Sequence, residues 1–554
     1  MTSSNPIDRL DSWKEIASFL RRDVRTVQRW EKKEGLPVYR HQHDKLGSVY
    51  AYRAELSSWF TGRQQAAPAT LSAPLAAKAD DPKVKLAVLP FGDLSGKTDD
   101  TFFTDGLTEE MITQLTRLQP SRLAVVARST AIHYNATEQS LRELQRNLSV
   151  DYVLEGRVRR AGNRVRITAQ LIDLEDHTQL WAETYERDLS DILKVQAEIA
   201  QAFAGEINLA VTRSEQSRLA DLAGGVRKIN PVAYESYLRA RYHLQGLTPA
   251  SIKNSIADFE QAIREDPKYA PFHAGLAYAY GLLAIAPFDL LPPREAMPQA
   301  EAAAKRALEL DDSLPEAHAA LALVLHHYHW DWKKAEASYR QALECDANYY
   351  VAHLWYSWLL LALNRRKEAF EEIEQAMLAA QETDPQRIVT VLATRAAAHY
   401  LGREYEQATE AFAKAMQHSP DYFMLHYVLG RASSLTGAEA HGINESKTAA
   451  VSVGEIPLMD TAWGLVNAIN GKKDQTFDTI RALEAASKKR YVPATYFGML
   501  YAVLDDKTKA LKWLEKAYEE RADGLTWLNV LPTLDSLRSS VRFKDLLRRV
   551  RLIQ

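Results

Sequence analysis

The chain has 554 residues, which is enough for three or more domains. Hydrophobic residues make up 46% of it and charged residues 25%, as in ordinary globular proteins, and a net charge of −3 gives no overall attraction to nucleic acid. The single cysteine, Cys345, excludes an intramolecular disulfide framework and indicates a reducing compartment. Because the sequence shows no signal peptide and no apolar run of membrane-spanning length, we expect a cytoplasmic protein with no membrane partner.

Residues 12–34 predict two short helices joined by a tight turn. Ser12 begins a capping-box pattern that starts the first helix at Trp13. Asp23 caps the second helix, which ends at Gly35. Two helices in this arrangement are typical of domains that place the second helix in the major groove of DNA.

The second helix carries side chains suited to reading DNA. Arginine can contact guanine at two points, glutamine can do the same with adenine, and lysine suits phosphates. The alternative is a small helical cap whose charges form a solvated face. The candidate DNA-binding residues of this helix are Arg25, Thr26, Gln28, Arg29, Lys32 and Lys33.

Residues 37–52 predict a hairpin that follows the two helices. Strands are expected at Val38–Tyr39 and Ser48–Tyr52, with a turn between them, and Arg53–Phe60 reads as a closing helix. Two histidines are too few for a metal site, so none is predicted. The basic side chains of this wing, which complete the candidate DNA-binding set, are Arg40, His41, His43 and Lys45.

The stretch Leu10–Phe60 resembles the winged helix-turn-helix of the MerR and excisionase type, so residues 1–60 are expected to form a DNA-binding domain. Residues 61–82 are rich in alanine, proline and serine without periodicity, which predicts a flexible linker.

Residues 83–225 predict a mixed α/β domain. Strand and helix patterns alternate here, and a turn at residues 160–163 joins two strictly alternating strands into a hairpin. The expected strands are Lys85–Phe91, Arg122–Ala127, Tyr152–Arg159, Arg164–Leu174 and Gln179–Glu186, and the expected helices are Leu107–Leu118, Leu141–Leu148 and most of 188–223.

This region resembles the TolB N-terminal-like domain of bacterial signalling proteins. The resemblance lies in Val88–Phe91, Asp93–Gly96, Phe103–Glu110, Asp151–Gly156 and Val165–Leu171. It implies a non-catalytic domain that joins an output domain to a repeat array. Family members often carry a membrane span before this domain, where the present chain has only the linker.

Two features of this domain suggest that it could bind an anion. The run Gly92–Thr98 ends in Gly-Lys-Thr like a phosphate-binding loop, but it has three residues between its glycines where such a loop needs four. On the predicted hairpin, one face carries a row of basic side chains. Such a row is ordinarily a solvated surface, and the alternative is a site for an anion or an acidic peptide. The row consists of Arg157, Arg159, Arg164 and Arg166.

Residues 230–524 predict an array of about eight tetratricopeptide repeats. The pairs Leu429-Gly430, Trp463-Gly464 and Phe497-Gly498 recur at 34 residues, with small residues at fixed positions, which is the signature of that repeat. Residues 525–554 are expected to form a helical cap. Such arrays hold a protein or peptide in a concave groove or associate into a homodimer. His326 and His329, on one helix face, leave a metal site as an alternative to packing.

The expected fold class is therefore multidomain: a small winged helix-turn-helix, a central α/β domain and a C-terminal all-α tetratricopeptide solenoid. We expect a DNA-binding transcriptional regulator whose partners are double-stranded DNA and a protein held by the array. The alternative is a scaffold that does not bind DNA. No nucleophile–base pair, metal set or intact phosphate loop is present in the sequence, so no enzyme activity, catalytic residue or cofactor is predicted.

Overall fold

The computed structural model describes residues 9–20, 27, 31, 36–40, 49–53, 55–56, 83–94, 101–116, 122–126, 131, 134, 137–207, 228–380, 385–419, 423–453 and 456–553. The chain divides into two compact units, Met1–Pro82 and Lys83–Gln554.

The N-terminal unit contains a three-stranded antiparallel sheet of order β1-β3-β2 and one described helix. Its elements are β1 (Arg9–Leu10), α1 (Trp13–Leu20), β2 (Tyr39–Arg40) and β3 (Val49–Tyr52). The β2–β3 pair confirms the predicted hairpin strands, whereas β1 was not predicted because two residues carry no periodicity.

Helix α1 begins at the predicted residue. The hydroxyl of Ser12 accepts a hydrogen bond from the backbone N–H of Glu15 at 3.2 Å, and the Glu15 carboxylate accepts one from the N–H of Asp11 at 2.8 Å. Both bonds satisfy backbone donors at the start of the helix. The buried face of α1, with Ile16 and Leu20, packs into the core of this unit.

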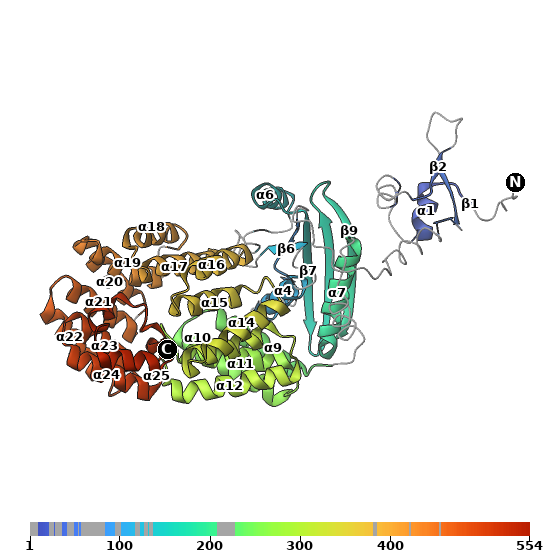
Figure 1. Cartoon of the computed structure of the whole chain (residues 1–554). Helices are drawn as coiled ribbons and strands as arrows, with labels where there is room; N and C mark the ends of the chain where they lie inside the picture. The colour runs from blue at the N-terminus through green and yellow to red at the C-terminus, as the bar shows by residue number, and fades with distance from the viewer. Residues whose placement is uncertain are drawn as a thin grey trace. The chain divides into compact units, whose positions relative to one another are not determined.

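The second unit begins with a mixed sheet of order β6-β4-β7-β8-β9 (Figure 1). The strands β6, β4 and β7 are parallel, β5 also pairs parallel with β7, and β7, β8 and β9 are antiparallel neighbours. Most of the expected elements are present, with slightly shifted ends. The elements are β4 (Val84–Val88), β5 (Gly92–Asp93), α4 (Thr101–Thr116), β6 (Leu123–Val126), α6 (Glu138–Leu148), β7 (Tyr152–Ala161), β8 (Arg164–Asp173), β9 (Thr178–Asp188) and α7 (Ile192–Glu206).

Helices cover the two faces of this sheet unequally. On one face, α4 and α7 bury the apolar residues of the strands in a large core. On the other face, α6 packs Leu141 and Leu144 against Ala87, Val126 and Val153, which belong to β4, β6 and the start of β7. The remainder of that face, over the rest of β7, β8 and β9, is lined by polar and exposed residues.

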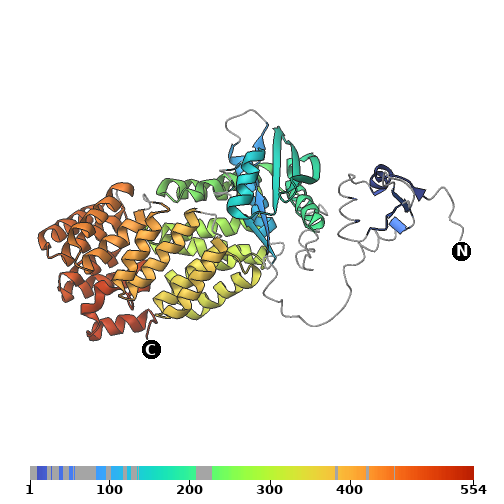
Figure 2. The same ribbon diagram turned by 90° about the horizontal axis from the view of Figure 1, so that it is seen from above.

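The helical array follows as successive hairpins, which Figure 2 shows stacked side by side. This confirms the predicted all-helical solenoid. The hairpins are α9 (Pro231–Gln245) with α10 (Pro249–Glu265), α11 (Ala270–Leu283) with α12 (Pro293–Leu310), α13 (Pro315–Val324) with α14 (Trp332–Cys345), α15 (Tyr350–Ala362) with α16 (Arg366–Ala380), α17 (Pro385–Leu401) with α18 (Tyr405–Met416), α19 (Phe423–Leu435) with α20 (Glu439–Val453), α21 (Pro457–Ile469) with α22 (Lys473–Ala486), and α23 (Ala494–Val503) with α24 (Lys507–Glu520).

The repeating glycines mark close contacts between helices. A Cβ atom added to Gly464 would lie 2.7 Å from Cδ2 of Leu500, and one added to Gly498 would lie 2.7 Å from Cδ2 of Leu514. Real atoms do not approach so closely without displacement, so the 34-residue period reflects positions where two helices leave no room for a side chain.

The α/β domain and the array share one core. The hydroxyl of Tyr237 on α9 donates to Glu110 of α4 at 2.9 Å, and a Cβ on Gly106 would lie 2.8 Å from Cβ of Leu238. The sequence had suggested two separate domains, but these contacts make the α/β domain and the array parts of one unit.

The end of the chain, where the sequence predicted a helical capping region, contains several short helical elements. Two short 3-10 helices, η5 (Asp523–Trp527) and η6 (Pro532–Leu537), precede α25 (Val541–Arg549). Within the described part of the chain, no helix has both the length and the apolar character that a membrane crossing requires.

Candidate nucleic-acid interface and inner face of the array

Most of the predicted DNA-binding residues lie outside the part of the chain that the structure describes. Arg40 is the member of the set that the structure describes. The others are Arg25, Thr26, Gln28, Arg29, Lys32, Lys33, His41, His43 and Lys45.

Arg40 lies on β2 of the expected wing and its side chain is 58% exposed. Its Nη1 donates to Oε1 of Glu31 at 2.7 Å, and this hydrogen bond raises the pKa of Arg40. The sequence listed Arg40 among the basic DNA-binding candidates of the wing. The structure adds that Glu31, a carboxylate from the predicted second helix, pairs with it.

The outer side of the same sheet carries tyrosines that sequence reasoning did not select. Tyr39 stacks on Tyr50 with ring centroids 5.4 Å apart, and Tyr52 meets Tyr50 edge-on at 5.9 Å. The guanidinium of Arg9 lies 5.2 Å from the centre of the Tyr50 ring. The alternation of β3 was the available signal, because Val49 and Ala51 are buried and the intervening tyrosines must point outward.

The predicted concave groove of the array contains residues of the chain itself. The segment Asp523–Leu537 packs among the first helices of several hairpins. The ring of Trp527 meets Trp358 of α15 edge-on at 5.3 Å and lies 6.3 Å from His326. A Cβ on Gly524 would lie 2.6 Å from Oγ1 of Thr495 on α23. Residues 523–527 therefore contact α15, η4 and α23, where a partner was expected to bind.

Asp523 joins three distant parts of the array in a buried position. Its Oδ1 lies 2.5 Å from Nδ1 of His327, and its Oδ2 accepts a hydrogen bond from the backbone N–H of Ala286 at 3.2 Å. The carboxylate of Asp289 accepts a hydrogen bond from the hydroxyl of Tyr496 close by. Burial raises the pKa of Asp289 to about 7, and the nearby Asp523 contributes to the rise.

Further contacts join the end of the chain to the array. Arg403 makes a two-point ion pair with Asp535, with nitrogen–oxygen distances of 3.0 and 2.5 Å. Nε1 of Trp332 donates to the backbone oxygen of Val550 at 3.1 Å. These bonds connect residues far apart in sequence, so no local pattern could have predicted them.

The histidines that suggested a metal site serve other contacts. His326 and His327 are buried in a π-helical turn, η4 (Leu325–His329), and Nε2 of His329 lies 2.8 Å from a carboxylate oxygen of Glu301. The residues described in the structure include no group of three histidine, cysteine or acidic side chains placed to hold an ion. Packing and pairing account for this cluster.

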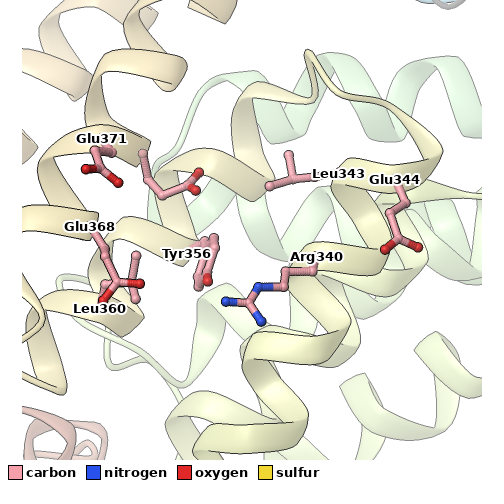
Figure 3. Close-up of a pocket in the computed structure, with 8 residues that line it drawn as sticks. Arg340, Leu343, Glu344, Tyr356, Leu360, Glu368 and Glu371 are labelled. Atoms are coloured by element: carbon pink, nitrogen blue, oxygen red, sulfur yellow. The ribbon is translucent and has the colours of Figure 1, made fainter. Parts of the chain in front are cut away.

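A surface pocket of about 380 Å³ lies between α14, α15 and α16 (Figure 3). Half of its lining residues are acidic, and several of their charges are already paired. Glu372 lies 2.6 Å from Nδ1 of His353, Glu368 pairs with Arg365, and Arg340 pairs with a neighbouring glutamate of its own helix. These charges are thus paired within α14 and within the α15–α16 hairpin.

The loop that resembled a phosphate-binding site begins as a strand. Gly92 and Asp93 form β5 and pair with Arg157 and Val158 of β7. The Gly-Lys-Thr end of the run lies outside the described residues. Because the first residues are held extended, they do not wrap around a ligand in the way that a phosphate loop does.

Comparison with known proteins identifies the region that was expected to be TolB-like. Residues 82–202 match the family model of the HilA/YgeH-like transcriptional regulator, second domain. The chain is 22% identical over 308 residues to the transcriptional regulator HilA of Salmonella typhimurium, covering 54% of this chain and 51% of HilA.

A second relative carries a different name. The chain is 35% identical over 243 residues to a Rhizobium meliloti protein named "Putative adenylate cyclase 3", covering 44% of this chain and 40% of that protein. The chain thus spans about half or less of the length of these relatives.

Solved structures give weaker similarity. A tetratricopeptide repeat protein from Parabacteroides merdae aligns with 50% of this chain and all of its own, at 12% identity and a TM-score of 0.34. TolB from Acinetobacter baumannii aligns with 24% of this chain and 31% of its own, at 21% identity and a TM-score of 0.19. These scores are too low to carry an argument.

The chain thus contains a region similar to the second domain of HilA-like transcriptional regulators, followed by a helical-hairpin array.

Proposed function

We propose that this protein is a DNA-binding transcriptional regulator. In this proposal the N-terminal unit binds duplex DNA, and the helical array contacts a protein partner or a second copy of the chain. The observation that carries it is the match of residues 82–202 to a domain of HilA-like regulators, next to a sequence typical of a winged helix-turn-helix.

The proposed DNA contacts divide into two kinds. Arg25, Gln28 and Arg29 contact base edges from the second helix of the N-terminal unit. The lysines of that helix and the basic residues of the wing contact phosphates, which fix the register of the protein on the duplex. Arg40 adds to this second group only when Glu31 releases it, because the two side chains are paired in the structure.

One domain of this size reads about half of a typical operator, and a single small interface binds weakly. Specific binding therefore needs a second copy of the chain, and the array supplies the surface for it. Since residues 523–537 contact several helices of the array, a partner at those contacts would bind in exchange for that segment, and other surfaces of the array remain as alternatives.

The relative named as an adenylate cyclase does not change this proposal. The chain spans 40% of that protein, so the name of the whole protein does not transfer to it. Among the described residues, no acidic or histidine group is placed to hold the metal ions that a nucleotide-converting enzyme commonly uses.

The test is genome-wide capture of DNA by the intact protein, followed by gel shifts on the recovered sequences. The double variant R25A/R29A should lose sequence-selective retardation. The double variant K488Q/K489Q, which removes two exposed positive charges from the array, should bind like the wild type. If R25A/R29A retains selective binding, this helix is not the reader. If the wild type captures no discrete sequences, the protein is a scaffold.

A further inference from the structure

The face of the central sheet opposite α4 and α7 carries four exposed arginine side chains, here called the arginine face. Arg157 and Arg159 lie on β7, and Arg164 and Arg166 lie on β8. The antiparallel register sets Arg159 directly opposite Arg166. Helix α6, which lies on this side of the sheet, packs on β4, β6, the start of β7 and the end of β8, so the arginine face lies farther along β7 and β8.

Arginines of the same three strands that point to the other side have acidic partners. Arg160 pairs with Glu235 of α9, and its guanidinium lies 5.5 Å from the centre of the Phe103 ring. Arg187 lies 3.8 Å from a carboxylate oxygen of Glu198 on α7. These two side chains are part of the packing between the sheet and its helices.

The arginine face is compensated only in part. Arg164 has one exposed partner, Glu186 of β9, at 3.3 Å, and the register sets Glu186 opposite Arg166 and Asp188 opposite Arg164. Within the described part of the chain, Arg157, Arg159 and Arg166 form no ion pair, although the charge of Arg157 acts on Glu155 of the same strand. Like charges directly opposite each other on a sheet destabilise it, so the Arg159–Arg166 pair costs stability, which Glu186 offsets only on the β9 side of Arg166.

We propose that the arginine face binds phosphates of duplex DNA, as a second DNA-contacting surface in addition to that of the N-terminal unit. This inference rests on the proposed function. Residues on one face of a strand are about 7 Å apart, so neighbouring guanidinium groups can each reach a different phosphate. Because both units belong to one chain, DNA held by the first is presented to the second at a high effective concentration.

The chemistry of the face favours a phosphate backbone over an acidic protein. The segment 152–173 contains five arginines and no lysine, and arginine binds phosphate oxygens at two points. Protein interfaces depend on buried aromatic or aliphatic anchors. No large exposed apolar side chain of the described residues belongs to β7, β8 or β9. A surface of this kind binds DNA without recognising its base sequence.

The experiment measures binding of the full chain to a random-sequence 30-base-pair duplex between 50 and 200 mM salt. The double variant R159Q/R166Q should lower the slope of log affinity against log salt by about 1.8, since each lost phosphate contact contributes about 0.9. The single variant R157Q should lower the slope by about 0.9, and it provides the test if the double variant folds poorly. The control K488Q/K489Q removes the same charge as the double variant and should leave the slope unchanged.

The outcomes separate this inference from the proposed function. Loss of slope in the arginine-face variants, with the preference for captured over random DNA retained, supports the inference. An unchanged slope overturns the inference about the arginine face. This holds even if R25A/R29A abolishes selectivity and so supports the second helix as the element that recognises the DNA sequence. Tighter binding of a poly-glutamate chain than of the duplex, lost in R159Q/R166Q, also overturns it and assigns the face to an acidic polypeptide.

Discussion

Replacing Asp523 by alanine should open the contact between the two ends of the helical array. The carboxylate is 4% exposed and serves two buried partners, Nδ1 of His327 and the backbone N–H of Ala286. Nε2 of His327 already has no partner in the described structure, so alanine would leave that ring buried without any hydrogen bond.

The expected cost follows from these two lost bonds. A buried polar group left without a partner costs about 1–3 kcal/mol, so two such groups cost roughly 2–6 kcal/mol. A cost of about 3 kcal/mol raises the population of the locally open state roughly 100-fold. Because the lost bonds hold the chain end against the first hairpins, the effect should be confined to the segments on either side of this contact.

Hydrogen–deuterium exchange measures this directly. In Asp523→Ala, residues 523–537 and 285–291 should exchange roughly 100-fold faster, while the α/β domain keeps its protection. Asp523→Asn retains one acceptor oxygen and should show a smaller change. Asp478→Ala removes an exposed carboxylate of α22 and should leave both segments unchanged. Unaltered exchange of both segments in Asp523→Ala would refute the reasoning.

Two further predictions concern charge. Burial raises the pKa of Asp289 to about 7, from an ordinary value of 3.8, so its neutral form is favoured by folding. Its stabilising contribution is therefore complete below about pH 4 and is lost progressively until the pH passes about 7, a total difference of roughly 4 kcal/mol. Urea unfolding at pH 5 and pH 8 should show about 3 kcal/mol of this loss in the wild type, because about two pKa units of the interval lie above pH 5, and a smaller loss in Asp289→Asn; equal losses would contradict it. On the N-terminal unit, Glu31→Gln should free Arg40 and steepen the salt dependence of DNA binding by up to about 0.9, while stability changes by less than about 1 kcal/mol. An unchanged salt slope would show that Arg40 meets no phosphate.

The sequence predicted well those features that depend on neighbours along the chain. The capping pattern at Ser12 placed the start of α1, and strict alternation placed β7, β8 and the turn between them. The 34-residue period located glycines at which helices of the array approach too closely for a side chain. Each of these signals arises because helices and strands repeat over a few residues, so a short stretch carries the whole pattern.

The candidate site was predicted less completely. The sequence located the wing strands and assigned Arg40 to the wing, but it missed the pairing of Arg40 with Glu31 and the tyrosines on the outer side of the sheet. It predicted a partner groove in the array but gave no sign that residues 523–537 would contact the array's helices. A single carboxylate such as Asp523 gives no pattern by which its distant partners can be recognised.

From local periodicity alone, the sequence determined that a small N-terminal unit precedes a mixed sheet and a long array of helical hairpins. Tertiary structure decided that the sheet and the array share one core, that four arginines gather on the face of the sheet opposite α4 and α7, and that the chain end returns to contact the array. Those features depend on contacts such as His327 with Asp523, whose partners are separated by 196 residues. The energy of such contacts comes from burial and pairing that exist only once the chain has folded.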